Sequence, residues 1–181
     1  MNIAFCVTAY GPCGAPAVDS WLKVVGATSR HCAVTHIGKV GSTGISDRQY
    51  THSAENQLVQ DALDMPDTTH IFFTEIDMIL QSDAIIKLLA LDQPIAAGLY
   101  HLRNGRGQPC LFQQVLTSLE NPYVFSPVSS FPLTEPFRVD HAGFGCVLFK
   151  REVFEDPKMP FPWFDLKAKM YGRDMYFYTK A

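Results

Sequence analysis

Two acidic side chains stand directly behind an apolar run in the segment THIFFTEIDMI, which begins at Thr69. Residues two apart in an extended segment point the same way, so Glu75 and Asp77 can face one position. Mg²⁺ and Mn²⁺ prefer oxygen ligands, and one or two carboxylates commonly hold them together with substrate phosphates. The same acids also fit a surface turn in which Asp77 and Asp83 cap the following helix. The spacing alone leaves both interpretations open.

A further candidate carboxylate, Asp174, lies in the segment PWFDLKAKMYGRDMYFYTKA that runs from Pro162. A positioned carboxylate can take a proton from a hydroxyl group, and with an ordinary pKa of about 3.9 it relies on positioning as well as basicity. An acid at a helix start is equally an ordinary N-terminal cap.

The segment HAGFGCVLFKREVFE places two glycines, Gly143 and Gly145, just after His141. These glycines permit close backbone approach or positive φ, or they form a plain turn before a strand. His141 can touch a ligand there, or it can be hydrogen-bonded within the core. The histidines show no H-x-x-x-H or H-E-x-x-H spacing.

The elements that must position these residues alternate over the first hundred residues. Expected strands cover Ile3–Thr8, Cys32–Ile37, Ile71–Thr74 and Pro94–Tyr100, and expected helices cover 17–29, 53–65 and 83–92, with N-caps at Ser53 and Ser82. This alternation predicts an α/β domain with a mainly parallel sheet flanked by helices. Ligands of such sheets sit beyond the carboxyl ends of the strands, where we expect Glu75 and Asp77.

The second part of the chain is richer in proline and serine, as in the segment ENPYVFSPVSSFPLTEPF. Short strands are expected at Leu111–Leu116, Phe137–Asp140 and Cys146–Phe149. We expect these strands to pack on the same sheet as the first part.

The composition limits the classes of partner. The chain has 181 residues, 47% hydrophobic and 18% charged, with a net charge of −3. These values indicate a globular protein and argue against a broad nucleic-acid surface. The five cysteines lack C-x-x-C spacing, which favours reduced thiols. The N-terminal apolar run is too short for a signal peptide or a membrane segment, so a cytoplasmic location is expected.

The stretch from Thr69 to Tyr100 resembles the central segment of GT-A type nucleotide-diphospho-sugar glycosyltransferases, especially the family-two-like group. There an apolar strand enters a D-x-D motif, and a helix and a strand reading roughly P-I-V-x-G-x-Y follow. Glu75 and Asp77 stand at the two acids here, and PIAAGLY matches the next strand. The resemblance implies one GT-A-like (Rossmann-like) domain over 1–181, with 1–100 nucleotide-binding and 101–181 on the acceptor side. It implies Mn²⁺ or Mg²⁺ on Asp77, with Glu75, a departure from Asp, nearby.

Two later segments extend the resemblance. Asp174 matches the catalytic base of inverting members in a G-E-D-x-x-F motif, although Arg173 replaces the preceding acid. The segment with His141, Gly143 and Gly145 looks like the acceptor-side segment of the family.

The nucleotide side is matched by shorter signals. Thr8 and Tyr10 lie where the family binds the base, although a core or turn role fits each equally well. Asn56 matches an A-R-N-like helix, in which Glu55 replaces the Arg. The positive charge that is lost there can be supplied by another basic residue, with Arg48, Arg103 and Arg106 as candidates.

The resemblance implies a metal-dependent glycosyltransferase that moves a sugar from a nucleotide-diphosphate donor to a glycan or other hydroxyl acceptor, with inversion. The altered residues Glu75, Arg173 and Glu55 also fit a non-catalytic module that binds a nucleotide or a partner. A sugar-nucleotide nucleotidyltransferase ranks last, because AYGPCGAP lacks a basic residue. The family's domains are usually longer, and many carry a further metal-ligating His, so the resemblance implies a trimmed domain, a fragment, or a domain without that ligand.

Overall fold

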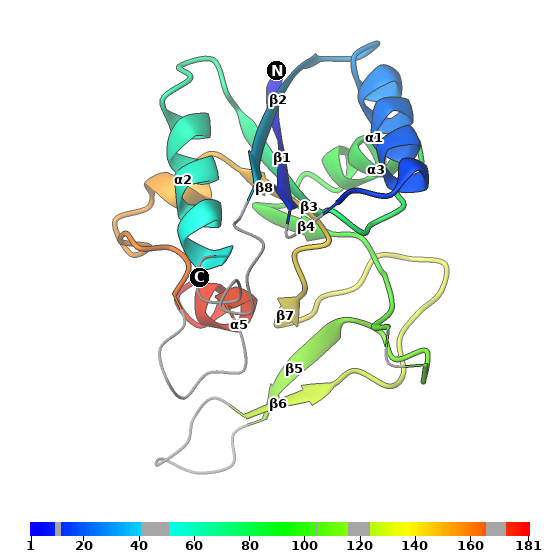
Figure 1. The fold of residues 1–181 in the computed structure, drawn as a ribbon. Helices are drawn as coiled ribbons and strands as arrows, with labels where there is room; N and C mark the ends of the chain where they lie inside the picture. The colour runs from blue at the N-terminus through cyan, green and yellow to red at the C-terminus, as the bar shows by residue number, and fades with distance from the viewer. Residues whose placement is uncertain (10–11, 41–50, 104, 116–123, 166–172) are drawn as a thin grey trace.

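The structure is a computed structural model that describes residues 1–9, 12–40, 51–103, 105–115, 124–165 and 173–181 (Figure 1). The helices are α1 (Ala15–Thr28), α2 (Thr51–Leu63), α3 (Ala84–Ala90), α4 (Glu152–Glu155) and α5 (Arg173–Tyr178). The strands are β1 (Asn2–Ala9), β2 (Ala33–Val40), β3 (His70–Glu75), β4 (Ile95–Ala97), β5 (Leu111–Val115), β6 (Val124–Pro127), β7 (His141–Ala142) and β8 (Cys146–Lys150).

A five-stranded central sheet runs in the order β2-β1-β3-β8-β4. β1 pairs in parallel with β2 and β3, whereas β8 pairs antiparallel with both β3 and β4. β4 therefore runs in the same direction as β3, and β8 is the strand that runs against the rest of this sheet. The expected α/β domain with a mainly parallel sheet and flanking helices is confirmed, with β8 from the later part of the chain inserted beside β3.

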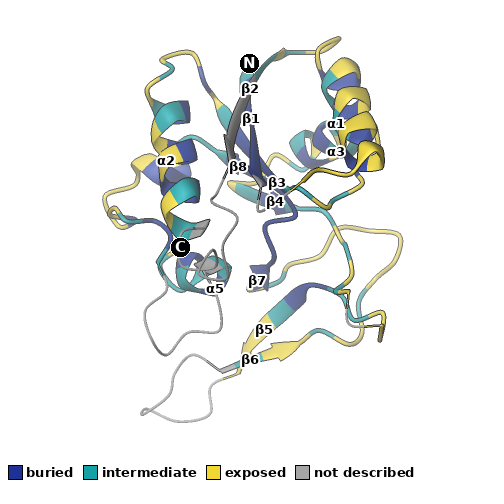
Figure 2. Cartoon of the chain, viewed as in Figure 1, coloured by how far each residue is buried: buried dark blue, intermediate teal, exposed yellow. Residues whose placement is uncertain are grey.

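Helices cover both faces of the central sheet, as Figure 1 shows. Successive side chains of a strand point to opposite faces. Ile3, Phe5 and Val7 of β1 accordingly pack in one core with residues of α1 and α3. Ala4 and Cys6 pack in the other core with residues of α2, α4 and α5. The middle strands β1, β3 and β8 are buried throughout most of their described lengths (Figure 2).

The core on the α2 side is built largely from aromatic rings. Phe73 and Phe149 of the sheet meet edge to face, with ring centroids 6.0 Å apart. Phe144, from the glycine segment, contacts Phe177 of α5 at 5.6 Å. Aromatic pairs in these geometries add to the stabilisation from burial. This packing ties the segment with Gly143 and Gly145, and also α5, to the central sheet.

A separate three-stranded sheet, in the order β6-β5-β7, lies beyond the carboxyl ends of the parallel strands (Figure 1). The expectation that the later strands pack on the central sheet holds for β8, which is part of that sheet, whereas β5 belongs to this second sheet. The strand expected at Phe137–Asp140 is wrong, because pairing with β5 begins only at His141. β6 was not expected, because its residues lie in the proline-rich segment and show no strand pattern of their own. They form a strand by pairing with β5, which precedes that segment.

Two predicted helix caps are wrong. α2 begins at Thr51, so Ser53 lies inside the helix. α3 begins at Ala84, and its N-cap residue is Asp83, whose side chain makes no capping hydrogen bond. Ser82 lies one residue before this N-cap. The carbonyl of Gln81 accepts a hydrogen bond from the N–H of Ala84, so a backbone turn rather than a serine side chain leads into α3.

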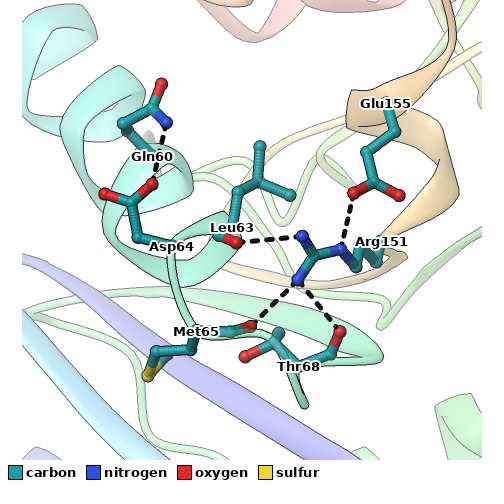
Figure 3. Close-up of polar contacts among 7 residues, drawn as sticks. All are labelled: Gln60, Leu63, Asp64, Met65, Thr68, Arg151 and Glu155. Carbon is teal, nitrogen blue, oxygen red and sulfur yellow. Dashed lines mark hydrogen bonds and ion pairs between the residues drawn. The ribbon is translucent and has the colours of Figure 1, made fainter.

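Arg151 joins the end of β8 to the end of α2 (Figure 3). Its Nη2 donates to the carbonyl of Leu63 at 2.9 Å, and its Nη1 donates to the carbonyl of Met65 at 2.9 Å. Its Nε donates to Oε1 of Glu155 at 2.7 Å. The last carbonyls of a helix have no intrahelical donor, so Arg151 satisfies groups at the end of α2.

Candidate functional site

The carboxyl ends of β1 and β3 meet at one edge of the central sheet. Thr8 and Glu75 are register partners there, and the carbonyl of Thr8 accepts a hydrogen bond from the N–H of Ile76 at 3.0 Å. Thr8 is 2% exposed, so its side chain is covered. Tyr10, which was expected beside it, lies outside the described residues.

The chain turns immediately after Glu75. The N–H of Met78 donates to the carbonyl of Glu75 at 3.0 Å, which closes a four-residue turn with Asp77 in its third position. The extended geometry expected to align Glu75 with Asp77 is therefore wrong. Asp77 does not cap α3 either, because Asp83 occupies that N-cap.

Asp77 is paired with Arg103. Nη2 of Arg103 lies 3.1 Å from Oδ2 of Asp77 and donates to the Asp77 carbonyl at 2.9 Å. The Arg103 side chain is 71% exposed and that of Asp77 is 43% exposed, and ion pairs this exposed contribute only about 0–1 kcal/mol. Arg103 can therefore leave Asp77 at little cost. It places at this edge a guanidinium of the kind that pairs with phosphates.

Tyr100 explains the two glycines. The hydroxyl group of Tyr100 accepts a hydrogen bond from the N–H of Gly145 at 3.2 Å. A Cβ on Gly145 would lie 2.9 Å from the Tyr100 ring, and a Cβ on Gly143 would overlap the Tyr100 hydroxyl group. Close approach of Tyr100 therefore requires glycine at both positions, so the glycines serve this contact.

Glu75 and Asp174 both act on the thiol of Cys110. Burial raises the pKa of Cys110, and the negative charges of Asp174 and Glu75 raise this pKa further, while a hydrogen bond with Tyr100 lowers it. Burial, Cys110 and Glu75 likewise raise the pKa of Tyr100 above its ordinary range. The charges of two acids predicted from distant segments thus both raise the pKa of one buried thiol, that of Cys110.

Asp174 lies in the first turn of α5 and lines a pocket of about 280 Å³. Its Oδ1 accepts a hydrogen bond from the N–H of Met175 at 3.0 Å. We call this cavity the Asp174 pocket; its lining residues are Leu102, Cys110, Phe112, Phe125, Pro127, Asp174 and Met175. A carboxylate among lining side chains that, as far as the structure describes them, are otherwise apolar can orient a hydroxyl group and take its proton.

His141 lies behind the wall of this pocket. It is 2% exposed and packs between the rings of Phe125 and Tyr178, with centroids 4.0 Å and 5.4 Å away. Burial lowers the pKa of His141 to about 4, so the ring is neutral at physiological pH. Neither ring nitrogen has a hydrogen-bond partner within the described part of the chain. The structure therefore places His141 in the core, covered from a ligand in the Asp174 pocket.

Asn56 is held by backbone groups of α2 and of the segment before α5. Its Oδ1 accepts hydrogen bonds from the N–H groups of Trp163 and Phe164, at 2.9 and 3.2 Å. Its Nδ2 donates to the carbonyls of His52 and Phe164, at 2.8 and 2.7 Å. The amide thus fastens α2 to the segment before α5. Its predicted role in nucleotide binding stays a prediction that these contacts do not support.

The other predicted basic and acidic positions are dispersed. Glu55 is fully buried on α2. Arg106 is exposed, and Arg48 lies outside the described residues, as does the side chain of Arg173. Arg103 is thus the predicted basic side chain that the structure places beside Asp77.

The carboxylates offer few ligands for Mn²⁺ or Mg²⁺. Among the described residues, no group of three or more His, Cys, Asp or Glu side chains could hold a metal ion. Mg²⁺ bound to a nucleotide typically needs only one or two carboxylates, because phosphates and water supply the other ligands. The exposed carboxylate of Asp77 alone meets that limited requirement.

Sequence reasoning missed Tyr100, Cys110 and Tyr178 as parts of this site. Tyr100 ends the segment PIAAGLY. A hydroxyl-bearing side chain at the carboxyl end of an expected strand was a usable signal, because ligands bind at that edge of the sheet. Cys110 and Tyr178 carried no signal, because their positions depend on how β5 and α5 pack on the glycine segment. Burial raises the pKa of Tyr178, and the charge of Asp174 adds to this effect.

No protein-family model and no curated protein matches the sequence. Among solved structures, the fold is similar to the crystal structure of A197 from STIV, with a TM-score of 0.60 at 18% identity. The match covers 99% of this chain and 77% of that chain. This likeness extends over nearly the whole chain and concerns the fold alone. No helix in the described part of the chain is long and apolar enough to cross a membrane.

Proposed function

We propose that the protein is a metal-dependent glycosyltransferase that moves a sugar from a nucleotide-diphosphate donor to an acceptor hydroxyl group, with inversion. One observation carries the proposal. The charges of Glu75, the last residue of β3, and of Asp174, on α5, both raise the pKa of the buried thiol of Cys110. A carboxylate at the donor edge and one in a pocket beside it are what transfer to a hydroxyl group requires.

Each residue has a distinct role in this proposal. Asp77, with Glu75 nearby, would hold Mn²⁺ or Mg²⁺, which when bound would neutralise charge on the donor diphosphate. Arg103 would leave Asp77 and pair with the diphosphate. Asp174 would take the proton of the acceptor hydroxyl group while the oxygen of that hydroxyl group bonds to the anomeric carbon. The bond from that carbon to the donor phosphate oxygen breaks, and the nucleotide diphosphate leaves.

Calorimetry with UDP- and GDP-sugars, with and without Mn²⁺, tests this function. We expect metal-dependent binding that Asp77→Ala weakens at least about tenfold, which corresponds to about 1.4 kcal/mol. Asp67→Ala, a change at an exposed acid outside the site, is the matched control. Asp174→Asn should keep donor binding and lower transfer by at least about a hundredfold. Unchanged binding in Asp77→Ala, or full transfer in Asp174→Asn, would rule out the assigned roles.

A second candidate is a non-catalytic module that binds a nucleotide or a partner. The ion pair between Arg103 and Asp77 favours it, because a guanidinium on the proposed metal ligand competes with a cation. Arg103→Ala separates the two candidates. If Arg103 assists the diphosphate, the variant binds nucleotide-sugar more weakly. If Arg103 merely blocks Asp77, the variant binds Mn²⁺ more tightly and still transfers no sugar.

A further inference from the structure

We propose that the Asp174 pocket binds a small aromatic alcohol, with the hydroxyl group directed to Asp174. The role of this alcohol as the sugar acceptor rests on the proposed function. The binding of the aromatic ring rests on the pocket alone.

The lining of the pocket matches an apolar ligand that carries one polar group. Among the described lining residues, Asp174 is the one with a charged side chain, and the others present rings, aliphatic groups, a thioether and a thiol. A glycan in the same place would bring several hydroxyl groups. Hydroxyl groups buried without hydrogen-bond partners lose affinity, so this lining favours one hydroxyl group over many.

The pocket is large enough to hold a single ring. Its volume of about 280 Å³ is near the lower end of the range for ligand pockets, which starts at about 300 Å³. Two lining residues, Phe112 and Phe125, come from the paired strands β5 and β6. Both are half-buried, so part of each side chain stays open to a ligand. Aromatic rings pair favourably in edge-to-face or offset arrangements.

The walls of the pocket are held in place from behind. The ring of Phe125 packs edge to face on His141, which is buried and neutral. Cys110 is hydrogen-bonded to Tyr100, and burial raises the pKa of this thiol, so it remains an uncharged, weakly polar wall. A pocket with fixed walls loses less conformational entropy when it binds a rigid ring than a pocket with mobile walls does.

Binding is measured by ¹⁹F NMR titration of the full chain with 4-fluorobenzyl alcohol, compared with unlabelled methyl β-glucoside as competitor. We expect saturable binding with a Kd of about 1 mM or tighter, as fits a fragment of this size. Leu102→Gln should weaken binding at least about fivefold, since it places an amide in the apolar wall. Leu133→Gln, at a residue 87% exposed and outside the pocket, is the matched control and should bind as the wild type does.

Phe112→Gln, on the other wall, repeats the test should Leu102→Gln fail to fold. Binding that both variants leave unchanged overturns the proposal. Displacement by methyl β-glucoside at the same concentration as the alcohol also overturns it. Tighter binding of 4-fluorobenzylamine than of the alcohol would overturn the assignment of a hydroxyl group and indicate an ammonium ligand for Asp174.

The same samples separate this inference from the proposed function. With a nucleotide-sugar and Mn²⁺, we expect the glycoside of 4-fluorobenzyl alcohol to form. Binding of the alcohol without any binding of nucleotide-sugar would defeat the glycosyltransferase and leave the pocket assignment standing. Transfer to methyl β-glucoside without binding of the alcohol would defeat the pocket assignment and leave the glycosyltransferase standing.

Discussion

Burial keeps the ring of His141 neutral, which makes the stability of the protein depend on pH. The pKa of His141 is lowered to about 4 by burial, although Asp140 raises it slightly. As the pH falls below the unfolded value of about 6.5, the unfolded chain binds a proton and the folded chain does not. Stability is therefore lost from about pH 6.5 down to about pH 4, at about 1.4 kcal/mol per pH unit.

We accordingly expect His141→Phe to remove part of this dependence. Between about pH 7.5 and about pH 5, the free energy of unfolding of the wild type should fall by about 2 kcal/mol more than that of the variant. Urea denaturation at the two pH values measures the difference. His101→Phe, at an exposed position, is the control and should keep the wild-type dependence. Equal pH dependence in wild type and His141→Phe would contradict a buried neutral ring.

Gly143 and Tyr100 should show energetic coupling. Gly143→Ala adds a Cβ that overlaps the hydroxyl group of Tyr100, and such overpacking costs about 1–3 kcal/mol. Tyr100→Phe removes that hydroxyl group, so the double variant should recover part of the loss, although Cys110 still crowds the new Cβ. A double-mutant cycle of denaturation midpoints gives the coupling energy. A coupling energy near zero would mean that the two residues do not pack as described.

At the scale of elements, Arg151 fastens β8 and α4 to the end of α2. Arg151→Ala leaves half-buried carbonyls at the end of α2 without their donor, so we expect a loss of about 2–3 kcal/mol in the free energy of unfolding. The matched control is Arg30→Ala, because Arg30 donates to the carbonyl of Gly26 near the end of α1 from an exposed position. That change should cost under about 1 kcal/mol. Similar losses in both variants would show that Arg151 has no special role.

The elements differ in how far the sequence predicts them. The buried strands β1, β3 and β8 and the helices α1 and α2 carry local apolar patterns, and these predict their positions to within a few residues. β6 and β7 are set by their pairing with β5, which no local pattern encodes. The same holds for the site. Asp77 and Asp174 can be recognised from the sequence, as an acid after a strand and an acid at a helix start. The positions of Arg103, Tyr100 and Cys110 depend on how distant parts of the chain pack together, which the local sequence does not show.

At the scale of the whole molecule, β8 joins the two parts of the sequence. β3 pairs with β8 on one side, and the described pairing of β4 is to β8. Residues 146–149 contribute to the cores on both faces of the sheet, with Val147 and Phe149 in one and Leu148 in the other. Full burial of such side chains contributes about 1.5–3 kcal/mol each. For these three the total is comparable with a domain's whole stability of about 5–15 kcal/mol.

A chain of residues 1–100 alone should therefore not fold, because it lacks the strand between β3 and β4. We expect a broad, non-cooperative thermal transition by circular dichroism and strong binding of an apolar dye, since Phe72, Phe73 and Ala96 lose their cover. The full chain, measured in parallel, should melt cooperatively and bind little dye. Adding a separate chain of residues 101–181 should restore part of the cooperative transition if β8 supplies the missing strand. A cooperative melt of 1–100 alone would instead make that part an independent folding unit and would leave β8 as an accessory strand.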